Sequence, residues 1–398
     1  MNQTEHSLRS MRARLFSRWL PIGCCLLVSI LLIRGQRSTG NVKELKASPG
    51  ISYFQENTER EPWSINVIKI DRNQNDIEFV TTIPRGTVQG LATLSQHLRG
   101  IPKALGSPVA AINGDFYETD NGDPRSLSIV QREVTSAPSG SAVFWLDETN
   151  QPHVSPIASR FKATFPSGEG IPFGLNEERS SGQAVLYTSR YGASTGAGAG
   201  LDLILQPATN APPLPLQVGQ TYKMAIQEIR STANTRLRPG SVVLSMGRGL
   251  ANQLPPLTTN SIITLSTATA PEIRNVRTAI SGGPLLVQGG KVQPANANKS
   301  REQHPRSAIG WNDKYFFLVQ VDGRQDFSRG MTLPELANYM AKIGCDTGMN
   351  LDGGASSELW LEGRIMNRPC HGQERDIANV LAVIRKPAAQ PVPNAAKN

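Results

Sequence analysis

The chain has 398 residues, of which 38% are hydrophobic and 18% charged, and its formal net charge is +9. This length and apolar content are enough for one large hydrophobic core or for two. Much of the positive charge is local, because six arginines precede residue 38 and only Glu5 opposes them. The rest of the chain has no Lys/Arg-rich run and no basic helix, so we expect no nucleic-acid partner. A mild attraction for anionic substrates is compatible with the remaining charge.

An apolar stretch over residues 19–33 follows four arginines near the N-terminus. This order is typical of a signal peptide or a signal anchor. The stretch is short for a membrane-spanning helix, which needs about 17–25 residues, and no small-x-small cleavage site follows it. Because most positive charge precedes it, we favour an uncleaved anchor with a cytoplasmic N-terminus; a cleaved signal peptide is the close alternative. We therefore expect an exported, extracytoplasmic (for example periplasmic) protein that is membrane-anchored or secreted.

The remaining chain divides by composition into a linker, a folded part and a tail. We expect the signal or anchor segment at residues 1–34, a polar linker at 35–55, one folded domain at 56–385 and a disordered Pro/Ala-rich tail at 386–398.

The first predicted elements of the folded part are strands. The apolar alternation over residues 63–70 slips by one residue, which predicts either a bulge or a strand buried on both faces. A turn and a second strand at residues 77–82 follow, so we predict a hairpin. We expect a short helix at residues 91–98 and further strands at residues 109–112, 129–134 and 142–146.

Two strand ends in this order carry polar loops. The strand at residues 109–112 ends in Asn113-Gly114-Asp115, which predicts either an ordinary Asn-Gly turn or an amide and a carboxylate that face a sugar or a cation. Further on, residues 275–280 run into Ser281-Gly282-Gly283. Ser281 lacks the G-x-S-x-G frame of a nucleophile, so we expect the backbone N–H groups of Gly282 and Gly283 to be the useful donors.

The most informative stretch is the strand–helix–strand unit that ends at Asp352. A predicted buried strand at residues 315–321 ends in Asp322, and the following helix starts with a T-x-x-E capping box. The next strand ends in Asp352, followed by Gly353, Gly354 and Ser356. If the two strands are parallel neighbours, both carboxylates lie on one sheet edge, where open α/β sheets bind ligands. The alternative is an ordinary Asp-Gly turn.

The two cysteines of the body, Cys345 and Cys370, allow two interpretations. An exported chain meets oxidising conditions, so they are candidates for a disulfide. Two unpaired thiols are the alternative. Without a C-x-x-C spacing, the cysteines do not predict a zinc site.

Several motifs, in this order, resemble the phosphodiester glycosidase family, which includes the uncovering enzyme. They are A-I-N-G-D-F-Y, N-V-R-T-A-I-S-G-G-P-L-L-V, R-S-A-I-G, V-D-G-R, G-M-T-L-P-E-L-A, M-N-L-D-G-G-A-S-S and Q-E-R-D-I-A-N-V. The resemblance covers roughly residues 60–385. It implies a single α/β (α+β) mixed-sheet domain that cleaves a sugar-1-phosphodiester at its glycosidic side. Many bacterial members resemble proteins of exopolysaccharide or envelope metabolism.

Two departures from the family pattern bear on the substrate. Cys370 and His371 stand where the family tends to a small residue and an acid, and Arg125-Ser126 stand where a glycine is more usual.

A glycosyl phosphodiester requires groups that hold the phosphate and groups that act at the sugar. Arginine suits phosphate because its guanidinium matches two oxygens, and our candidates are Arg306, Arg375 and Arg125. Glycosidases commonly use two carboxylates, and we rank Asp352 first and Glu374 second; the alternative for Glu374 is that it orients Arg375. Other candidate substrate-binding residues come from the polar loops: Asn113, Asp115, Gly282, Gly283, Gly353, Gly354 and Ser356.

Oxygen ligands and histidines give weaker predictions. Asp322 and Asp115 are candidate ligands of a divalent cation, calcium or magnesium. His304 and His371 are candidate proton carriers, with a structural role as the alternative.

Three functions compete at this point. The first is a glycosidase of sugar-1-phosphodiesters on envelope or exopolysaccharide glycans. The second is a non-catalytic glycan-binding module on the same scaffold. The third is a metal-dependent phosphodiesterase, which would release a sugar phosphate instead of a free sugar.

Overall fold

The computed structural model describes residues 41–58, 61–196, 198–231, 234–254, 256–294 and 301–387. The apolar stretch at residues 19–33 and most of the expected tail lie outside these ranges, so their predicted roles stay predictions. Within the described ranges, no helix combines the length and the apolar character that crossing a membrane requires. Part of the expected linker is folded, because β1 (Asn41–Lys46) and β2 (Ile51–Thr58) pair as antiparallel strands.

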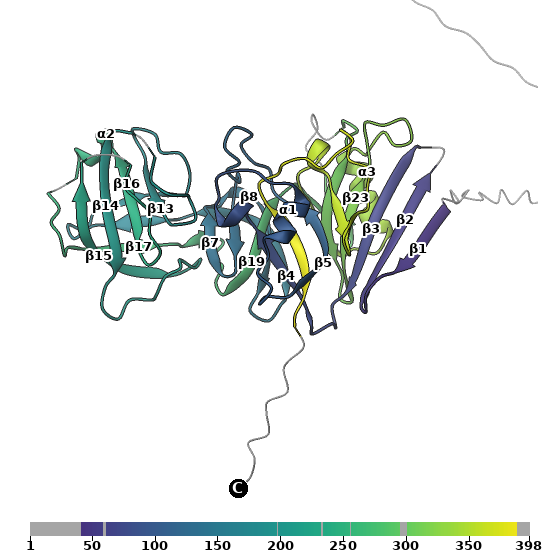
Figure 1. The fold of residues 1–398 in the computed structure, drawn as a ribbon, viewed down its shortest axis with the longest axis horizontal. Coiled ribbons are helices and arrows are strands. Elements are labelled where there is room, and N and C mark those ends of the chain that lie inside the picture. Colours follow the sequence, from purple (N-terminus) through teal and green to yellow (C-terminus); the bar gives the residue numbers. More distant parts are fainter. Residues whose placement is uncertain are drawn as a thin grey trace, which may run out of the picture. The chain divides into compact units, whose positions relative to one another are not determined.

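The described chain is rich in strands, which form four sheets (Figure 1). The first sheet joins β1, β2, β3 (Trp63–Asp71), β23 (Tyr315–Val321), β22 (Arg306–Trp311), β24 (Thr347–Asn350), β20 (Leu285–Gln288) and β21 (Lys291–Val292). The second joins β11 (Gly170–Pro172), β10 (Lys162–Thr164), β17 (Ile262–Ser266), β15 (Thr221–Arg230), β14 (Gly200–Pro207), β16 (Val242–Gly247), β13 (Ala184–Tyr187) and β12 (Gly174–Leu175).

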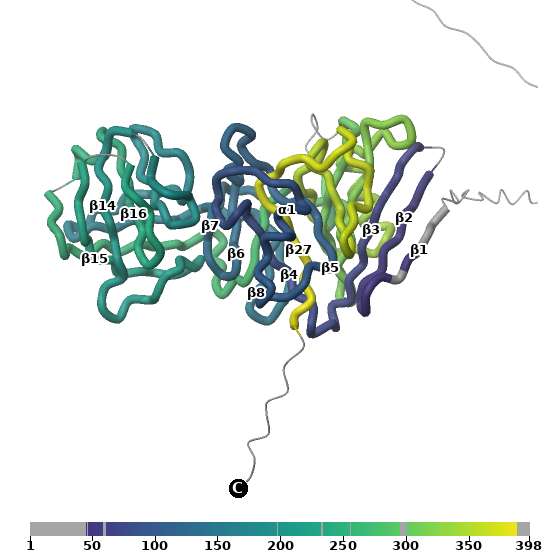
Figure 2. The backbone as a smooth tube through the Cα atoms, viewed as in Figure 1, coloured from purple at the N-terminus to yellow at the C-terminus, as the bar shows by residue number. Residues whose placement is uncertain are grey.

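The two smaller sheets complete the β structure. One joins β18 (Thr269–Ala270), β9 (Pro152–Ser159), β8 (Ser139–Asp147), β19 (Val276–Gly282), β6 (Ser128–Val130) and β7 (Glu133–Ser136). The other joins β26 (Arg364–Ile365), β25 (Leu359–Leu361), β5 (Ser107–Asn113), β27 (Val380–Arg385) and β4 (Ile77–Thr82). In the tube of Figure 2, β5 and β27 lie next to one another, as their pairing requires.

The predicted α/β class overstates the helix content, and this is a correction. Among the described strands, β12 and β13 form a parallel pair and the other pairings are antiparallel. Antiparallel strands need only short connections, so few helices are required to join them. The α-helices are α1 (Leu94–Arg99), α2 (Arg248–Ala251) and α3 (Leu333–Lys342), with short 3-10 turns η1 (Pro84–Gly86) and η2 (Gly354–Ser356).

The capping box before α3 is confirmed. The Thr332 hydroxyl accepts from the Glu335 N–H at 3.3 Å, and the Glu335 carboxylate accepts from the Thr332 N–H at 2.7 Å. These bonds satisfy two helix N-terminal donors. Gly344 follows the helix with φ of 92°, a conformation that favours glycine. The apolar face of α3 packs into a buried cluster with residues of β3, β22 and β23.

β3 pairs with β2 and β23 without a register shift and is buried on both faces, which confirms the second of the two alternatives for this strand and excludes the bulge. Two other strand predictions need correction. β4 pairs with β27, so the predicted β3–β4 hairpin is wrong. Residues 129–134 are not one strand: β6 and β7 form a hairpin whose turn residues, Gln131 and Arg132, both have positive φ.

The parallel neighbours proposed for the Asp322 and Asp352 strands are separated by a third strand. β22 lies between β23 and β24 and is antiparallel to both, so β23 and β24 run in the same direction. Asp322 and Asp352 therefore leave the same edge of the sheet. A Cβ on Gly323 or on Gly353 would touch Pro305 at 2.6 or 2.8 Å, so both turns pack closely against the start of β22.

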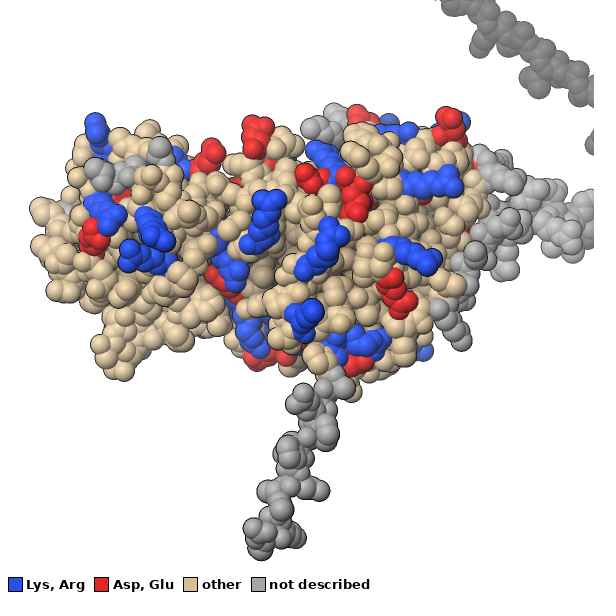
Figure 3. Space-filling view, viewed as in Figure 1, with Lys and Arg blue, Asp and Glu red and all other residues tan. Residues whose placement is uncertain are grey.

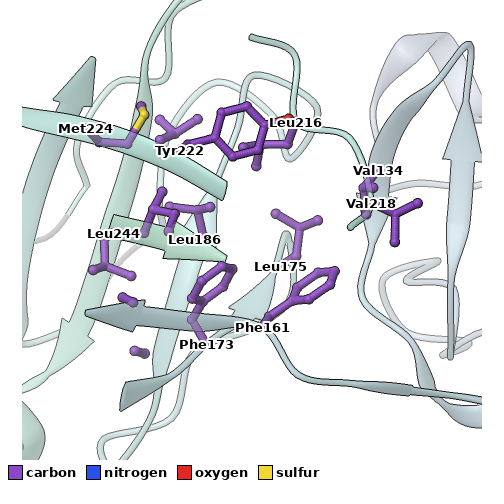
Figure 4. Close-up of a cluster of buried hydrophobic side chains, with 14 of the residues drawn as sticks. Val134, Phe161, Phe173, Leu175, Leu186, Leu216, Val218, Tyr222, Met224 and Leu244 are labelled. Carbon is purple, nitrogen blue, oxygen red and sulfur yellow. The ribbon is translucent and has the colours of Figure 1, made fainter. Parts of the chain in front are cut away.

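The largest buried cluster joins the second sheet to residues of β6, β7, β8 and β19. Figure 4 shows part of it, where Phe161 and Phe173 lie beside Leu175 and Val218. The ring centroids of Phe161 and Phe173 are 5.7 Å apart. This packing connects the second sheet to the six-stranded sheet that contains β19.

Candidate functional site

Asp352 lies where the end of β24 meets the end of β5. Its N–H donates to the Gly114 carbonyl at 2.9 Å, and its carbonyl accepts from the Asn113 side chain at 2.7 Å. Its carboxylate accepts from the Gly353 N–H at 2.9 Å. The backbone is thus held on two sides, and the residue is only partly buried. These contacts fix the backbone of Asp352 while its carboxylate stays only partly exposed.

A second carboxyl, Asp115, lies near Asp352, because Asp352 bonds to the carbonyl of the preceding Gly114 and its charge acts on Asp115. Its side chain is 3% exposed, and Oδ2 has no hydrogen-bond partner within the described residues. The Asp115 N–H donates to the Asn379 side chain at 2.7 Å. A Cβ on Gly114 would lie 2.1 Å from Asn379 Oδ1, so this close approach requires glycine. The A-I-N-G-D motif therefore serves to bring Asp115 near Asp352.

The two carboxyls have different proton affinities. Burial raises the pKa of Asp115 to about 8, and the negative charge of Asp352 acts in the same direction. Burial raises the pKa of Asp352 to about 6, while the nearby Ser356 hydroxyl, Arg375 and Arg125 partly oppose this rise. Near pH 7, Asp115 is mostly protonated and Asp352 mostly ionised. Two acids whose pKa values are pushed apart can serve as a proton donor and a base.

Two of the predicted arginines stand at the exposed rim of this carboxyl pair. Arg375 is exposed, and its guanidinium carbon lies 5.8 Å from the ring centroid of Tyr117. Arg125 is paired with Glu118 at 2.9 Å, and both side chains are 57% exposed. A pair this exposed contributes little stability, so it leaves Arg125 available for an anion. The positive charges of both arginines lower the pKa of Asp352.

Arg324 is an arginine at this rim that we did not select from the sequence. Its guanidinium Nη2 lies 3.2 Å from the position that a Cβ on Gly354 would occupy. Gly354 has φ of 63°, so a side chain there would be strained as well as crowded. The V-D-G-R motif was the available signal, but we read only its aspartate.

Arg306 differs from these arginines because it is buried. Its Nε donates to the Met331 carbonyl at 2.8 Å, and its Nη2 donates to the Glu302 carbonyl at 2.7 Å. Burial lowers its pKa to about 10. This position corrects our prediction: Arg306 ties the start of β22 to the segment before α3 and does not present a free fork to phosphate.

The glycine N–H groups that we expected to be free donors are occupied. Gly283 donates to the Asn350 carbonyl at 2.7 Å, and Gly354 donates to the Pro305 carbonyl at 2.8 Å. The Gly353 N–H is held by the Asp352 carboxylate. At Gly282, a Cβ would lie 2.3 Å from the Asn350 carbonyl oxygen, so close packing explains this glycine. These loops shape the site but supply no free backbone donor from these three positions.

Two polar residues of the predicted set lie inside the site. The Asn113 amide is buried; its oxygen accepts from the Ser307 hydroxyl at 2.6 Å and from the Glu358 N–H at 3.1 Å. It positions Asp352 and does not face a sugar, contrary to our prediction. The Ser356 hydroxyl is buried and close enough to Asp352 to lower its pKa, and its role as a substrate contact stays a prediction.

Glu374 contacts Ser95, and the predicted alternative role of contacting Arg375 belongs to Glu358 instead. Glu374 accepts from the Ser95 N–H at 2.8 Å and from the Ser95 hydroxyl at 2.7 Å, at the start of α1. The Arg375 N–H is instead held by Glu358 at 2.7 Å. Glu358 is fully buried, and burial raises its pKa to about 8. We overlooked Glu358, because an acid that follows two serines at a strand start carries no recognised pattern.

Asp322 and Asp115 do not form the predicted cation site together. Asp322 accepts from the Ser64 hydroxyl at 2.9 Å and from the Arg368 N–H at 3.0 Å. In the part of the chain that the structure describes, no group of three or more His, Cys, Asp or Glu side chains is arranged to hold a metal ion. Among the residues that the structure describes, neither aspartate therefore belongs to an acidic cluster that could hold a cation.

Within the described residues, the candidate histidines and the two cysteines of the body form no hydrogen bond with Asp352 or Asp115. His304 contacts Glu302 at 2.9 Å and Arg324 at 3.4 Å, so it is placed to orient Arg324. His371 is exposed. Cys345 is buried and Cys370 partly buried, and both are free thiols, which decides against the disulfide.

Comparison with known proteins identifies the family of this segment. Residues 222–384 match the family model described as phosphodiester glycosidase. The family resemblance is thereby confirmed. The matched residues include Asp352, Glu358 and Arg375 but not Asp115.

The individual proteins that resemble this chain are only distantly related to it. An uncharacterized SPbeta prophage-derived protein of Bacillus subtilis (strain 168), YomE, is 31% identical over 114 residues, which are 28% of this chain and 18% of that relative. A hypothetical protein from Synechocystis has a similar structure, with a TM-score of 0.70 and 19% identity over 87% of this chain and 64% of that one.

A putative exported protein from Burkholderia pseudomallei K96243 gives a TM-score of 0.62 and 20% identity, over 83% of this chain and 74% of that one. At these identities the two structures show a shared fold alone. The zebrafish N-acetylglucosamine-1-phosphodiester alpha-N-acetylglucosaminidase catalytic domain gives a TM-score of 0.44 and 13% identity, over 86% of this chain and 81% of that one.

Proposed function

We propose that this protein hydrolyses a sugar-1-phosphodiester at the glycosidic side of the phosphate. The observation that carries the proposal is the pair of neighbouring carboxyls, partly exposed Asp352 and buried Asp115, with three exposed arginines at or near the rim. The arginines suit a phosphate, and the carboxyls suit the sugar carbon to which it is attached. The family match points to the same chemistry.

In the proposed reaction, Arg324, Arg375 and Arg125 bind the phosphate oxygens. Ionised Asp352 stabilises positive charge at the anomeric carbon and accepts a proton from the attacking water. The water oxygen forms a bond to that carbon while the bond from carbon to phosphate oxygen breaks. A phosphate ester is a good leaving group, so protonated Asp115 serves mainly to keep a second negative charge away from Asp352.

The proposed substrate class and location rest on the sequence. The apolar segment at residues 19–33 supports export, and an exported enzyme of this class would meet envelope or exopolysaccharide glycans. Membrane attachment through that segment belongs to the same proposal.

The test is a product analysis of the purified protein with α-linked sugar-1-phosphodiesters, including diesters of N-acetylglucosamine-1-phosphate. Free sugar with an intact phosphomonoester, detected by mass spectrometry and lost in Asp352→Asn, is the expected result. A sugar phosphate as product, lost on chelation, would assign a phosphodiesterase instead. Binding of the diesters without any product would leave a glycan-binding module.

A further inference from the structure

A cavity of about 460 Å³ opens beside α1, and its lining contains neither carboxyl of the pair nor any of the rim arginines. It is enclosed by β4, η1, α1, the loop after α1 and the turn between β6 and β7. Its volume lies within the range of roughly 300–1,000 Å³ that sites for small organic ligands have. The proposed hydrolysis does not use this space.

The walls of the cavity are mainly apolar. Val80, Ile83, Ala92, Ile101 and Val130 line it, and each is between 4% and 9% exposed. They come from β4 and its end, from the segments on either side of α1, and from β6. Removing an apolar group from water is favourable in proportion to the area that it buries. These walls therefore suit a ligand with an apolar body.

The buried histidine of α1 adds no charge to the cavity. His97 is 3% exposed, and its Nε2 lies 3.1 Å from the Ile377 carbonyl, which only accepts, so Nε2 is the donor. Nδ1 then accepts from the Thr82 hydroxyl at 3.0 Å. Burial lowers the pKa of His97 to about 4, so the ring is neutral at pH 7. The interior is thus neutral and does not suit a charged group.

The charge of the cavity comes from two arginines, Arg85 and Arg190. Within the described residues, its lining contains no aspartate or glutamate. Arg190 is partly neutralised, because its Nε donates to the Glu133 carboxylate at 2.6 Å. Arg85 is exposed, so it lies where the cavity opens to solvent. A guanidinium at the opening of an apolar cavity suits a ligand whose polar end is an anion.

Two residues at the opening have uncommon backbone conformations. Arg85 and Gln131 both have φ of 50°, a region in which residues other than glycine are infrequent. Gln131 and Arg132 form the β6–β7 turn, where Asn-Gly would fit with less strain. The chain therefore keeps an arginine and an amide side chain at the opening in spite of their backbone cost, as is typical of ligand sites.

The general surface charge does not explain why an anion would bind at this place. In Figure 3, lysine and arginine side chains are dispersed over the visible face with acidic side chains among them. Exposed charges that are more than about 8–10 Å apart are largely screened at physiological ionic strength. The attraction for an anion at the cavity is therefore local and depends mainly on Arg85.

We propose that this cavity binds a single-chain amphiphile, with the apolar chain against the walls and an anionic head at Arg85. A carboxylate and a phosphate monoester share the chemistry of this head. The inference does not rest on the proposed function, because no residue of the carboxyl site lines the cavity. It adds a second ligand site to the protein, and its test requires no turnover.

The first measurement compares decanoate, decyl phosphate, butyrate and decyltrimethylammonium by calorimetry on the full chain at pH 7. Decanoate or decyl phosphate should bind at least about a hundredfold more tightly than butyrate, because the longer chain removes more methylene groups from water. The same anion should bind at least about tenfold more tightly than decyltrimethylammonium, which Arg85 repels. Equal affinity for the ten-carbon anions and the ten-carbon cation, or no binding of either anion, would overturn the proposal.

Arg85→Glu tests the contact with the head. Reversing the local charge should weaken the binding of decanoate by about tenfold or more. Arg132→Glu is the matched control, because Arg132 is also exposed, also has a positive φ (71°) and does not line the cavity. It changes the net charge equally and should alter the affinity by less than about threefold. Equal losses in both variants would show a general charge effect and reject a site at Arg85.

Pro102→Trp tests the cavity itself. Pro102 is exposed and lines the cavity, so an indole there would occupy the space for the chain. Ala104→Trp is the matched control, because Ala104 is exposed in the turn that the bond from the Leu105 N–H to the Pro102 carbonyl closes, and it lies outside the lining. A preference for decanoate over butyrate that is lost in Pro102→Trp and kept in Ala104→Trp supports the site even if Arg85→Glu does not fold. Unchanged binding of decanoate in Pro102→Trp would reject it.

Discussion

β23 and β24 each end in an Asp-Gly pair at the same edge of one sheet, but the two aspartates have different surroundings. Asp322 is 1% exposed and accepts from Ser64, Arg368 and Gln320. Asp352 is partly exposed and accepts from the neighbouring Gly353 N–H, and its other interactions are with charged or hydroxyl groups of the rim. The same Asp-Gly dipeptide thus holds neighbouring segments by hydrogen bonds at Asp322 and leaves a carboxylate available at Asp352.

The difference shows that hydrogen-bond saturation, and not the motif, separates a structural aspartate from a candidate catalytic one. A saturated buried carboxylate stabilises the fold, and its loss leaves donors unpaired. An unsaturated carboxylate near a second acid is available to a substrate.

The largest expected effect comes from replacing each of the two aspartates with asparagine in a separate variant. Asp352→Asn should lower kcat by about 10³-fold or more with little change in stability, because it removes the charged group at the sugar carbon. Asp322→Asn should instead lower the free energy of unfolding by about 1–3 kcal/mol, because a buried hydrogen-bond network is broken. Steady-state turnover gives kcat and urea denaturation gives the free energy of unfolding for both variants. Similar losses of kcat in the two variants would show that the two aspartates do not differ in role.

The second prediction concerns pH. With Asp352 near a pKa of about 6 and Asp115 near about 8, activity should be bell-shaped between these values. It falls below about 6 as Asp352 is protonated, and above about 8 as Asp115 ionises beside Asp352. Asp115→Asn should remove the alkaline limb. The measurement is the pH profile of kcat/KM for this variant. If the profile still falls at alkaline pH, ionisation of Asp115 is not the cause of that fall.

The buried acid also predicts a pH dependence of stability. Between about pH 4 and 8 the unfolded chain ionises Asp115 while the folded protein keeps it protonated, so the free energy of unfolding should fall as pH rises through this window. Asp115→Asn should have a smaller slope. Denaturation midpoints at pH 5 and pH 8 for the parent and the variant give the comparison.

Glu358 should have an intermediate effect, through Arg375. Glu358→Gln keeps an acceptor for the Arg375 N–H, whereas Glu358→Ala removes it. We expect the alanine variant to raise KM about tenfold with a smaller change in kcat, and the glutamine variant to restore KM. Steady-state kinetics distinguish the two. Equal KM values in both variants would mean that the carboxyl does not position Arg375.

The smallest effect is expected from reducing agents. Because Cys345 and Cys370 are free thiols, dithiothreitol should leave the thermal midpoint and the activity unchanged. A fall of several degrees in the midpoint would indicate a disulfide after all.

The sequence was most informative where a signal is local. The T-x-x-E box of α3 and the strand at residues 315–321 were both predicted, since capping and periodicity depend on residues close in the chain. The predicted hairpin of β3 with β4 was wrong, because β4 pairs with β27 from the other end of the domain. A short strand carries no local information about such a partner.

The candidate site divides in the same way. Asp352, Arg375 and Arg125 were found from motif and chemical type, and Asp115 was chosen for a strand-end loop without its relation to Asp352. Only the tertiary structure placed Asp115 near Asp352, buried Arg306 and set Glu358 behind Arg375. Burial and long-range hydrogen bonds decide which charged side chain is free to act, and both arise only when distant segments pack together.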